Sequence, residues 1–442
     1  MDNTITYMDQ GSFLALRALG RQPLMQFVWI YDRGVDIDGL RRFQRNLGHG
    51  LLGRHIETSP LPFGRHRWVA EPGPADLEMA TAERPRDQVW DWADERVRLP
   101  LDPEFGPAWR LGVQPLTDGG AAVSLVVSHS VADAMGLCIA IADAGNGHRR
   151  DFGYPTPGAR ATRAAVAQDL RTTLRSLPDA GRAFAATVRL ARSARDDVAS
   201  SVKAAAPRVT PGGDNQVTAP TATVWIDLQQ WDSRAESLGG TSNSLFAGLA
   251  SRLGAALGRV GPDGRVMLSW PVSDRVEGDT RANALTSVMF SADPAKVTTT
   301  LTEVRGDMKA ALIALPETSE ELLAPLPLVT FTPKALARRL EMMVGKIGDP
   351  VGCSNLGDLD PAVNRPDGSD ADRIAFRLLE PEITTGILDR TRGYLYLGSG
   401  RVHGQIFVSI GAWVPGGPNT KELLRTALQR AVTEMGLTGT VE

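Results

Sequence analysis

Residues 123–137 read VSLVVSHSVADAMGL, and this stretch decides the fold of the chain around it. The run from Val123 to Ser128 is mostly apolar and β-branched, which is typical of a buried strand, and it ends abruptly at His129. Asp133 follows four residues later, and small and apolar residues then recur at helical spacing. The stretch therefore predicts a buried strand, a tight corner that carries the histidine, and a helix that begins near Asp133. A histidine held between two such elements is fixed firmly enough to act as a general base.

The spacing of His129 and Asp133 proves little by itself. The chain has six histidines, so an aspartate at this spacing from one of them arises by chance in about one such chain in three. The remaining histidines have no supporting motif and are predicted to be surface or packing residues: His49, His55, His66, His148 and His403. The rest of the chain has to support a role for the HxxxD pair.

The composition is that of a globular protein. The 442 residues are 42% hydrophobic and 22% charged with a formal net charge of −3, whereas nucleic-acid-binding domains are usually basic. Cys138 and Cys353 lie far apart in apolar surroundings, which argues against a disulfide framework or a zinc site and favours a reducing compartment. Residues 1–4 lack a signal-peptide pattern, and no apolar run approaches the ~20 residues that cross a bilayer. We expect a cytoplasmic protein that binds no nucleic acid and no metal.

The length and one polar segment predict two lobes. A chain of 442 residues exceeds the usual size of a single hydrophobic core. Residues 207–222, PRVTPGGDNQVTAPTA, combine prolines, glycines and polar residues without periodicity, as linkers do. We therefore assign residues 1–206 to an N-terminal lobe with the HxxxD pair and residues 223–442 to a C-terminal lobe. Strands and helices alternate in both, which favours α/β or α+β layers over a helical bundle.

Two further segments carry clear structural signals. Residues 107–113 predict a strand that pairs with Ala121–Ser128 across the turn Thr117–Gly120, so the strand before His129 lies inside a sheet. Residues 161–206 are rich in alanine and arginine, and the simplest interpretation is a surface helix packed by one apolar stripe. A helix that lies on a membrane surface or under an apolar substrate is left open. The apolar stripe consists of Phe184, Val188, Ala191, Val198 and Val202. The arginines between its members are Arg182, Arg189, Arg192 and Arg195.

Short motifs over nearly the whole chain occur in an order typical of one family. They are Tyr7–Phe13 (YMDQGSF), Pro100–Asp102 with Pro107–Trp109, the HxxxD pair, Thr241–Ser244, Pro271–Arg275 (PVSDR), Asn283, and Ser354–Gly357 (SNLG). On these motifs the chain resembles the acyltransferases of the chloramphenicol acetyltransferase-like fold. The resemblance is greatest to the bacterial wax ester synthase/diacylglycerol acyltransferase branch and its condensation-domain relatives. Each motif is short, and their shared order and spacing carry the resemblance.

The chain departs from the family pattern at three positions. Ser128 stands where the motif HHxxxDG has its first histidine, and Ala134 stands where it has its glycine. The second histidine, which matters for catalysis in the family, is kept as His129. Ser244 replaces an aspartate at the start of a helix, so a role carried over for that position is in doubt. Ala134 is expected to narrow the space beside the corner.

The resemblance implies a fold and a reaction. The fold would have two similar α/β lobes that form a V, with a tunnel between them and His129 at its middle. The reaction would transfer an acyl group from a thioester, either acyl-CoA or a phosphopantetheine-linked acyl group, to a hydroxyl or amine acceptor. His129 would be the general base, and the chain has no G-x-S-x-G elbow that would suggest an acyl-enzyme. The thioester is a co-substrate, and no permanently bound cofactor is expected.

The resemblance also assigns supporting residues. It implies that Asp133 forms a buried bidentate pair with Arg275, which holds the corner and ties the lobes together. By their place in the motifs, Asn283, Ser354 and Asn355 are candidates for oxyanion or substrate contacts. Turn and capping roles for these three are equally open.

Two other functions stay open. One is a free-standing condensation enzyme of a carrier-protein assembly line, where the basic segment 182–195 could dock an acidic acyl or peptidyl carrier protein or CoA phosphates. The other is a condensation-like protein that only binds a partner or metabolite, against which the retention of His129, Asp133 and Arg275 argues. The acceptor, the acyl chain and the donor are not determined. We expect a monomer, since one chain supplies both lobes, in the cytoplasm or at a membrane surface.

Overall fold

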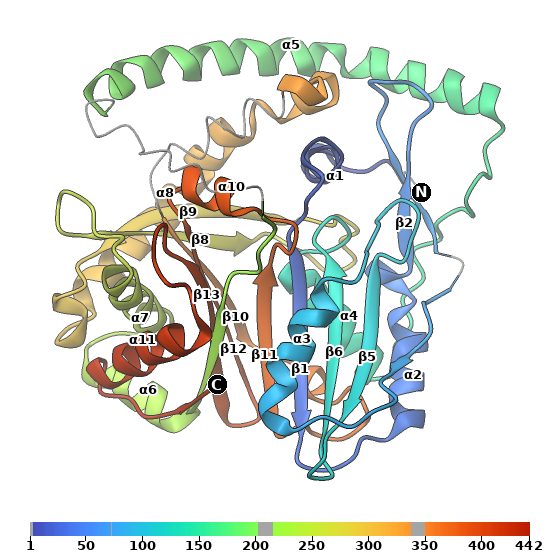
Figure 1. The fold of residues 1–442 in the computed structure, drawn as a ribbon. Coiled ribbons are helices and arrows are strands. Elements are labelled where there is room, and N and C mark those ends of the chain that lie inside the picture. The colour runs from blue at the N-terminus through green and yellow to red at the C-terminus, as the bar shows by residue number, and fades with distance from the viewer. Residues whose placement is uncertain (1–2, 72, 202–214, 337–349) are drawn as a thin grey trace.

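The computed structural model describes residues 3–71, 73–201, 215–336 and 350–442. Their strands form a five-stranded sheet, a seven-stranded sheet and a two-stranded sheet (Figure 1). The first has the order β11-β1-β6-β5-β4, with β1 Leu24–Tyr31, β4 Glu78–Met79, β5 Trp109–Pro115, β6 Ala121–Ser128 and β11 Arg373–Leu379. The second has the order β14-β7-β13-β12-β10-β8-β9, with β7 Thr221–Asp227, β8 Val266–Ser273, β9 Leu285–Ala292, β10 Val351–Asp358, β12 Tyr394–Val402, β13 Gln405–Trp413 and β14 Thr440–Val441. The third pairs β2 Arg54–Glu57 with β3 Arg67–Ala70.

Helices cover and connect these sheets. In the N-terminal half they are α1 Tyr7–Leu19, α2 Ile37–Leu47, α3 Val89–Val97, α4 Ala134–Gly145 and α5 Thr162–Ser201. In the C-terminal half they are α6 Leu228–Ser237, α7 Ser242–Ala256, α8 Thr302–Leu323, α10 Thr385–Arg390 and α11 Lys421–Glu434. A short 3₁₀ helix, η4 (Leu326–Phe331), packs against α1 and α5. Within the parts of the chain that are described, no helix combines the length and the apolar character needed to cross a bilayer.

The strand before the histidine lies in the middle of its sheet, as predicted. β6 pairs antiparallel with β1 on one side and with β5 on the other, and every one of its residues is buried. Trp109 of β5 lies opposite Val127 of β6, which is the hairpin that the sequence indicates. Because β6 is covered on both faces, apolar residues suit all its positions, and its end at Ser128 lies inside the molecule.

One strand crosses from the C-terminal half into the first sheet. β11 pairs antiparallel with β1, so residues 373–379 extend the sheet that contains β6. The two sheets meet where β11 contacts β12 and β13 (Figure 1). A division into lobes by sequence alone did not anticipate this exchange, and the boundaries at 206 and 223 remain a proposal. Residues 207–214 of the expected linker lie outside the described residues, and its last two residues already belong to β7.

Two helix starts explain residues singled out in the sequence. Asp133 is the N-cap of α4 and accepts a hydrogen bond from the backbone N–H of Gly136. Thr241 caps α7, and the side chain of Ser244 accepts a hydrogen bond from the Thr241 N–H in return. Ser244, which departs from the family pattern, thus completes a capping box at the helix start.

Candidate active site

The corner after β6 is held by its backbone and by a serine hydroxyl. The His129 N–H donates to the carbonyl of Pro23 at 3.2 Å, and the His129 carbonyl accepts from the Asn283 side chain at 3.4 Å. Ser128 is fully buried, and its hydroxyl donates to Gln22 and accepts from the N–H of Ser130. At this position a serine closes the turn through its side chain, which explains how the corner forms without a histidine here.

His129 lines a cavity of about 580 Å³. Most of the wall is apolar, with Met8, Ala15, Met135, Leu285, Leu326, Val329, Leu356, Phe376 and Leu378. The predicted site residues Asp133, Asn283, Ser354 and Asn355 line the same cavity, as does Ala134, so the structure brings together residues from both halves of the sequence. No hydrogen bond or ion pair joins the ring of His129 to any other residue within the described ranges. In the part of the chain that the structure describes, the polar contacts that fix this residue are those of its backbone.

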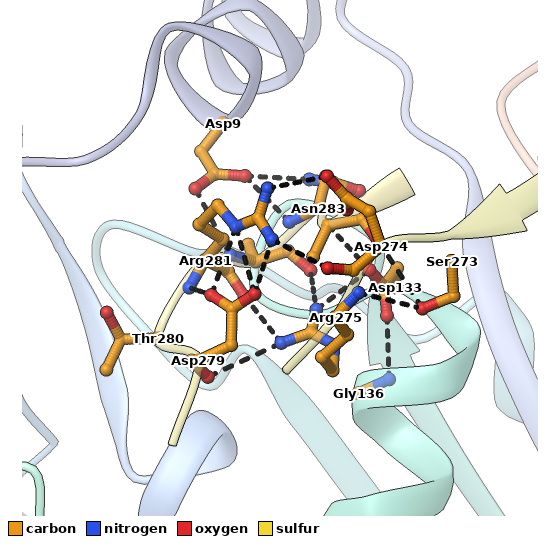
Figure 2. A network of polar contacts seen from close by, with 12 residues as sticks. Asp9, Asp133, Gly136, Ser273, Asp274, Arg275, Asp279, Thr280, Arg281 and Asn283 are labelled. Atoms are coloured by element: carbon orange, nitrogen blue, oxygen red, sulfur yellow. Dashed lines mark hydrogen bonds and ion pairs between the residues drawn. The ribbon is translucent and has the colours of Figure 1, made fainter. Parts of the chain in front are cut away.

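Asp133 and Arg275 form the predicted ion pair, with 2.8 Å between Oδ2 and Nη2 (Figure 2). Their side chains are 2% and 3% exposed, so this is a buried pair. The expected bidentate geometry is wrong, because Asp133 Oδ1 instead accepts the N–H of Gly136 at 2.6 Å. The other hydrogen bonds of the Arg275 guanidinium go to the carbonyls of Asp279, Arg281 and Ala282. One carboxylate therefore caps α4 and holds the arginine at the same time.

The segment between β8 and β9 crosses to the first sheet and is bound there on two sides. Asp133 accepts the N–H of Ala284 at 2.7 Å, and its own N–H donates to the Ala282 carbonyl. From α1, the fully buried carboxylate of Asp9 accepts the N–H groups of Ala282 and Asn283 at 3.1 and 2.8 Å (Figure 2). The sequence assigned no role to Asp9, although it lies in one of the recognised motifs. Asp9 and Asp133 together fix this segment against the histidine corner.

Arg54 is a second residue that the sequence interpretation missed. Its side chain is fully buried, with its guanidinium carbon 3.7 Å from the centre of the Trp68 ring. It donates to the Val131 carbonyl at 3.0 Å, which is in the corner, and to the Thr280 carbonyl in the crossing segment. Burial lowers the pKa of this arginine. A charged residue at the start of a short strand, in the sequence GRHIE, is the only local signal that could have indicated it.

The three candidate oxyanion contacts differ in whether their side-chain hydrogen-bond donors already have acceptors. The Asn283 amide donates to Asp9 at 3.2 Å and to the His129 carbonyl, which uses both of its N–H groups. The Asn355 amide donates to Asn243 at 2.7 Å. Ser354 lies beside Tyr396, which also lines the cavity and whose phenol interacts with the Ser354 side chain. Burial raises the pKa of Tyr396, so its hydroxyl stays protonated and can donate a hydrogen bond.

A second cavity of about 510 Å³ lies on the other side of the ion pair. Met135 and Ser273 line both cavities, so the two cavities are neighbours. The second cavity is more polar, and its wall includes His49, Asp143, His148, Arg150, Arg275, Glu277 and Asp279. His49 and His148 are exposed, as predicted, although both lie at the wall of this cavity. His55, by contrast, contacts Glu71 at 3.1 Å from a partly buried position, and His403 is exposed.

His66 is a packed histidine, and its burial predicts a pH effect on stability. It is 8% exposed, lies edge-on to Phe13 and accepts the N–H of Ser59. Burial lowers its pKa from 6.5 to about 4, against the opposing effect of Asp169. Because the unfolded chain binds more protons between these two values, the free energy of unfolding falls as the pH drops from about 6.5 toward 4. We expect a loss of roughly 2 kcal/mol from this group between about pH 7 and pH 5.

Urea unfolding at the two pH values measures this effect. His66→Gln keeps an acceptor for the Ser59 N–H and should lose this part of the pH dependence. His403→Asn, at an exposed histidine with a φ of 51° that asparagine tolerates, should retain it. An unchanged pH dependence in His66→Gln would show that other groups cause it.

The comparisons with known proteins concern the fold. No protein-family model matches the chain, and no curated protein matches its sequence. Solved structures do match over nearly its whole length. The first condensation domain of the calcium-dependent antibiotic synthetase is 16% identical with a TM-score of 0.59, over 98% of this chain and 97% of that one. Polyketide synthase associated protein 5 from Mycobacterium tuberculosis is 16% identical with a TM-score of 0.55, over 98% of each chain. The wax ester synthase/diacylglycerol acyltransferase from Marinobacter aquaeolei VT8 is 16% identical with a TM-score of 0.54, over 98% of each chain.

These likenesses show that the chain has the two-lobed, mixed α/β fold of condensation domains. The predicted two-lobed α/β fold class is therefore confirmed, whereas the V shape and the tunnel between the lobes stay predictions. At 16% identity the matches concern architecture alone, and any activity has to be argued from the residues of the site.

Proposed function

We propose that this protein is an acyltransferase that moves an acyl group from a thioester to a hydroxyl or amine acceptor, with His129 as the general base. The observation that carries the proposal is the position of His129, at the end of a buried central strand and in the wall of a largely apolar cavity of about 580 Å³. The fold shared with a wax ester synthase/diacylglycerol acyltransferase supports the same class of reaction.

The proposed reaction needs only one catalytic base. A ring nitrogen of His129 takes the proton from the acceptor O–H or N–H as the acceptor attacks the thioester carbonyl. The carbonyl becomes a tetrahedral oxyanion, which collapses as the C–S bond breaks. The imidazolium then gives its proton to the leaving thiolate, so the ring returns to its starting state without an acyl-enzyme.

The oxyanion needs hydrogen-bond donors close to the reacting carbon. Ser354 and Tyr396 are the better candidates, because both residues line the cavity and carry hydroxyl donors. Asn283 is the weaker one, because both N–H groups of its amide already have acceptors. We propose a positioning role for Asn283 through its contact with the His129 carbonyl.

The two cavities suggest where the parts of the thioester substrate bind. The apolar cavity suits an acyl chain, and the polar one suits the phosphate-bearing arm of CoA or the phosphopantetheine of a carrier protein. A passage past Met135 and Ser273 would join them as a tunnel. The likeness to a condensation domain of a synthetase supports a carrier-bound donor as one form of the proposal. We further propose a monomer, and a cytoplasmic location that the two free, buried thiols of Cys138 and Cys353 support.

Thiol release tests the proposal. The protein is incubated with acyl-CoA of increasing chain length, or with the same acyl groups on a carrier protein, with and without simple alcohols and amines. We expect release that requires an acceptor, increases with acyl length and yields an ester or amide detectable by mass spectrometry. Release that is independent of acceptor, or absent with both donors while a ligand still binds, would contradict it in favour of a binding protein.

A further inference from the structure

Helix α5 lies across the outside of the molecule, over α1 (Figure 1). Its side chains are described from Thr162 to Arg189, and the predicted stripe beyond that point lies outside the described side chains. The face that packs inward carries small or polar residues, with Ala165, Asp169, Ala183 and Ala186 buried. Asp169 anchors this face through Arg160 at 2.8 Å and the Ser59 hydroxyl at 2.6 Å.

The outward face of α5 carries the large apolar residues. Leu170, Leu174, Leu177 and Phe184 are 49%, 56%, 49% and 63% exposed. Their spacings of four, three and seven residues place them in one row about 20 Å long. A surface helix normally buries such a row and exposes its small and polar residues. Helix α5 therefore exposes its large apolar residues and buries small and polar ones, which is the reverse of the usual arrangement. The sequence predicted that Phe184 packs inward, and this prediction is wrong.

A row of arginines runs beside the leucines. Arg171, Arg175, Arg182 and Arg189 are exposed and follow one another at spacings of four and seven residues. Asp179 is the only acidic residue on the outward part of α5 between residues 162 and 189, and it pairs with Arg182. Among the described residues, none forms an ion pair with Arg171 or Arg175. The outer surface of α5 is thus apolar along one line and strongly basic along the next.

We propose that this outer face of α5 docks on an anionic lipid surface. Leucine and phenylalanine enter the boundary between headgroups and acyl chains, while the neighbouring arginines contact lipid phosphates. The charge argues against a second copy of the chain, because two such faces would bring arginine rows together. The row is exposed along its length, as contact with an extended surface requires.

The inner face of α5 connects this surface to the cavity. It contacts η4, whose residues Leu326 and Val329 line the wall of the His129 cavity. Docking would therefore hold the apolar cavity beside the bilayer, where acyl chains are found. This consequence rests on the proposed function, whereas the docking itself does not.

Vesicle co-sedimentation tests the docking without any acyl transfer. We expect the full chain to bind vesicles of phosphatidylcholine mixed with phosphatidylglycerol, and to bind phosphatidylcholine alone at least about tenfold more weakly. The triple variant Arg171→Gln, Arg175→Gln, Arg182→Gln should bind the anionic vesicles roughly 100-fold more weakly. The variant with serine at Leu170, Leu174, Leu177 and Phe184 should lose binding. These side chains point outward, so unchanged melting is expected and is the check on folding.

Matched controls distinguish binding through this face from non-specific adsorption to the vesicles. Arg41→Gln, Arg42→Gln and Arg45→Gln remove the same charge from the exposed face of α2. Val260→Ser, Met267→Ser, Met289→Ser and Leu423→Ser remove four exposed apolar side chains elsewhere. Both controls should bind within about twofold of the wild type. Absence of binding to anionic vesicles, or an equal loss in the controls, would overturn the proposal and leave the acyltransferase assay unaffected.

Discussion

Replacing His129 by alanine is expected to slow acyl transfer by roughly 10²–10⁴-fold while leaving the melting temperature close to that of the wild type. The loss follows from removing the only proposed base in a cavity whose wall is otherwise mostly apolar. The fold should survive, because the polar contacts of this residue run through its backbone. The N–H to Pro23 and the carbonyl to Asn283 are both retained by alanine.

Steady-state kinetics and chemical rescue distinguish a base from a binding group. A lost base lowers kcat with little change in KM, and free imidazole that enters the vacated space should restore part of the rate. His403→Asn, at an exposed histidine that lines neither of the two cavities, is the control for removing an imidazole. Turnover of His129→Ala within a few-fold of the wild type would mean that the proposed chemistry is wrong.

The local structure of the site could be predicted because its signals are local. The β-branched run that ends at Ser128 indicates a strand, and an aspartate before small apolar residues indicates a helix cap. Both elements are present as β6 and α4. The pairing of Asp133 with Arg275 spans 142 residues, and only the order of motifs in a resembling family could suggest it.

The remaining contacts could not be predicted because they depend on which distant surfaces meet. Asp9 binds Ala282 across 273 residues, and nothing in the sequence of α1 marks a buried carboxylate as the partner of that segment. The bidentate geometry was wrong for a related reason, since the helix N-terminus takes one oxygen of Asp133. In α5 the apolar row would normally indicate the inner face, but the surface beneath it accepts Asp169 and alanines instead.

Asp133→Ala is expected to lower the free energy of unfolding by about 3–5 kcal/mol, and so to damage folding as much as catalysis. The change leaves the Arg275 guanidinium buried at 3% exposure without its counter-charge. It also removes the acceptor of two buried N–H groups, those of Gly136 and Ala284. Each loss is costly, because an unpaired charge or donor in the interior is not compensated by water.

Three variants, measured by urea unfolding and by thiol release, separate the structural role of Asp133 from a catalytic one. Asp133→Asn keeps an acceptor for one N–H group but removes the charge, so it should be destabilised less than Asp133→Ala. Asp143→Ala, on the same helix, breaks a partly exposed pair with Arg150 and should cost under about 1 kcal/mol. A double-mutant cycle with Arg275→Gln should give a coupling energy of about 1–3 kcal/mol, as expected for a directly contacting pair. If Asp133→Ala melted like the wild type and lost only turnover, the carboxylate would have a catalytic role. Asp9 and Arg54 alone would then have to hold the corner that presents His129.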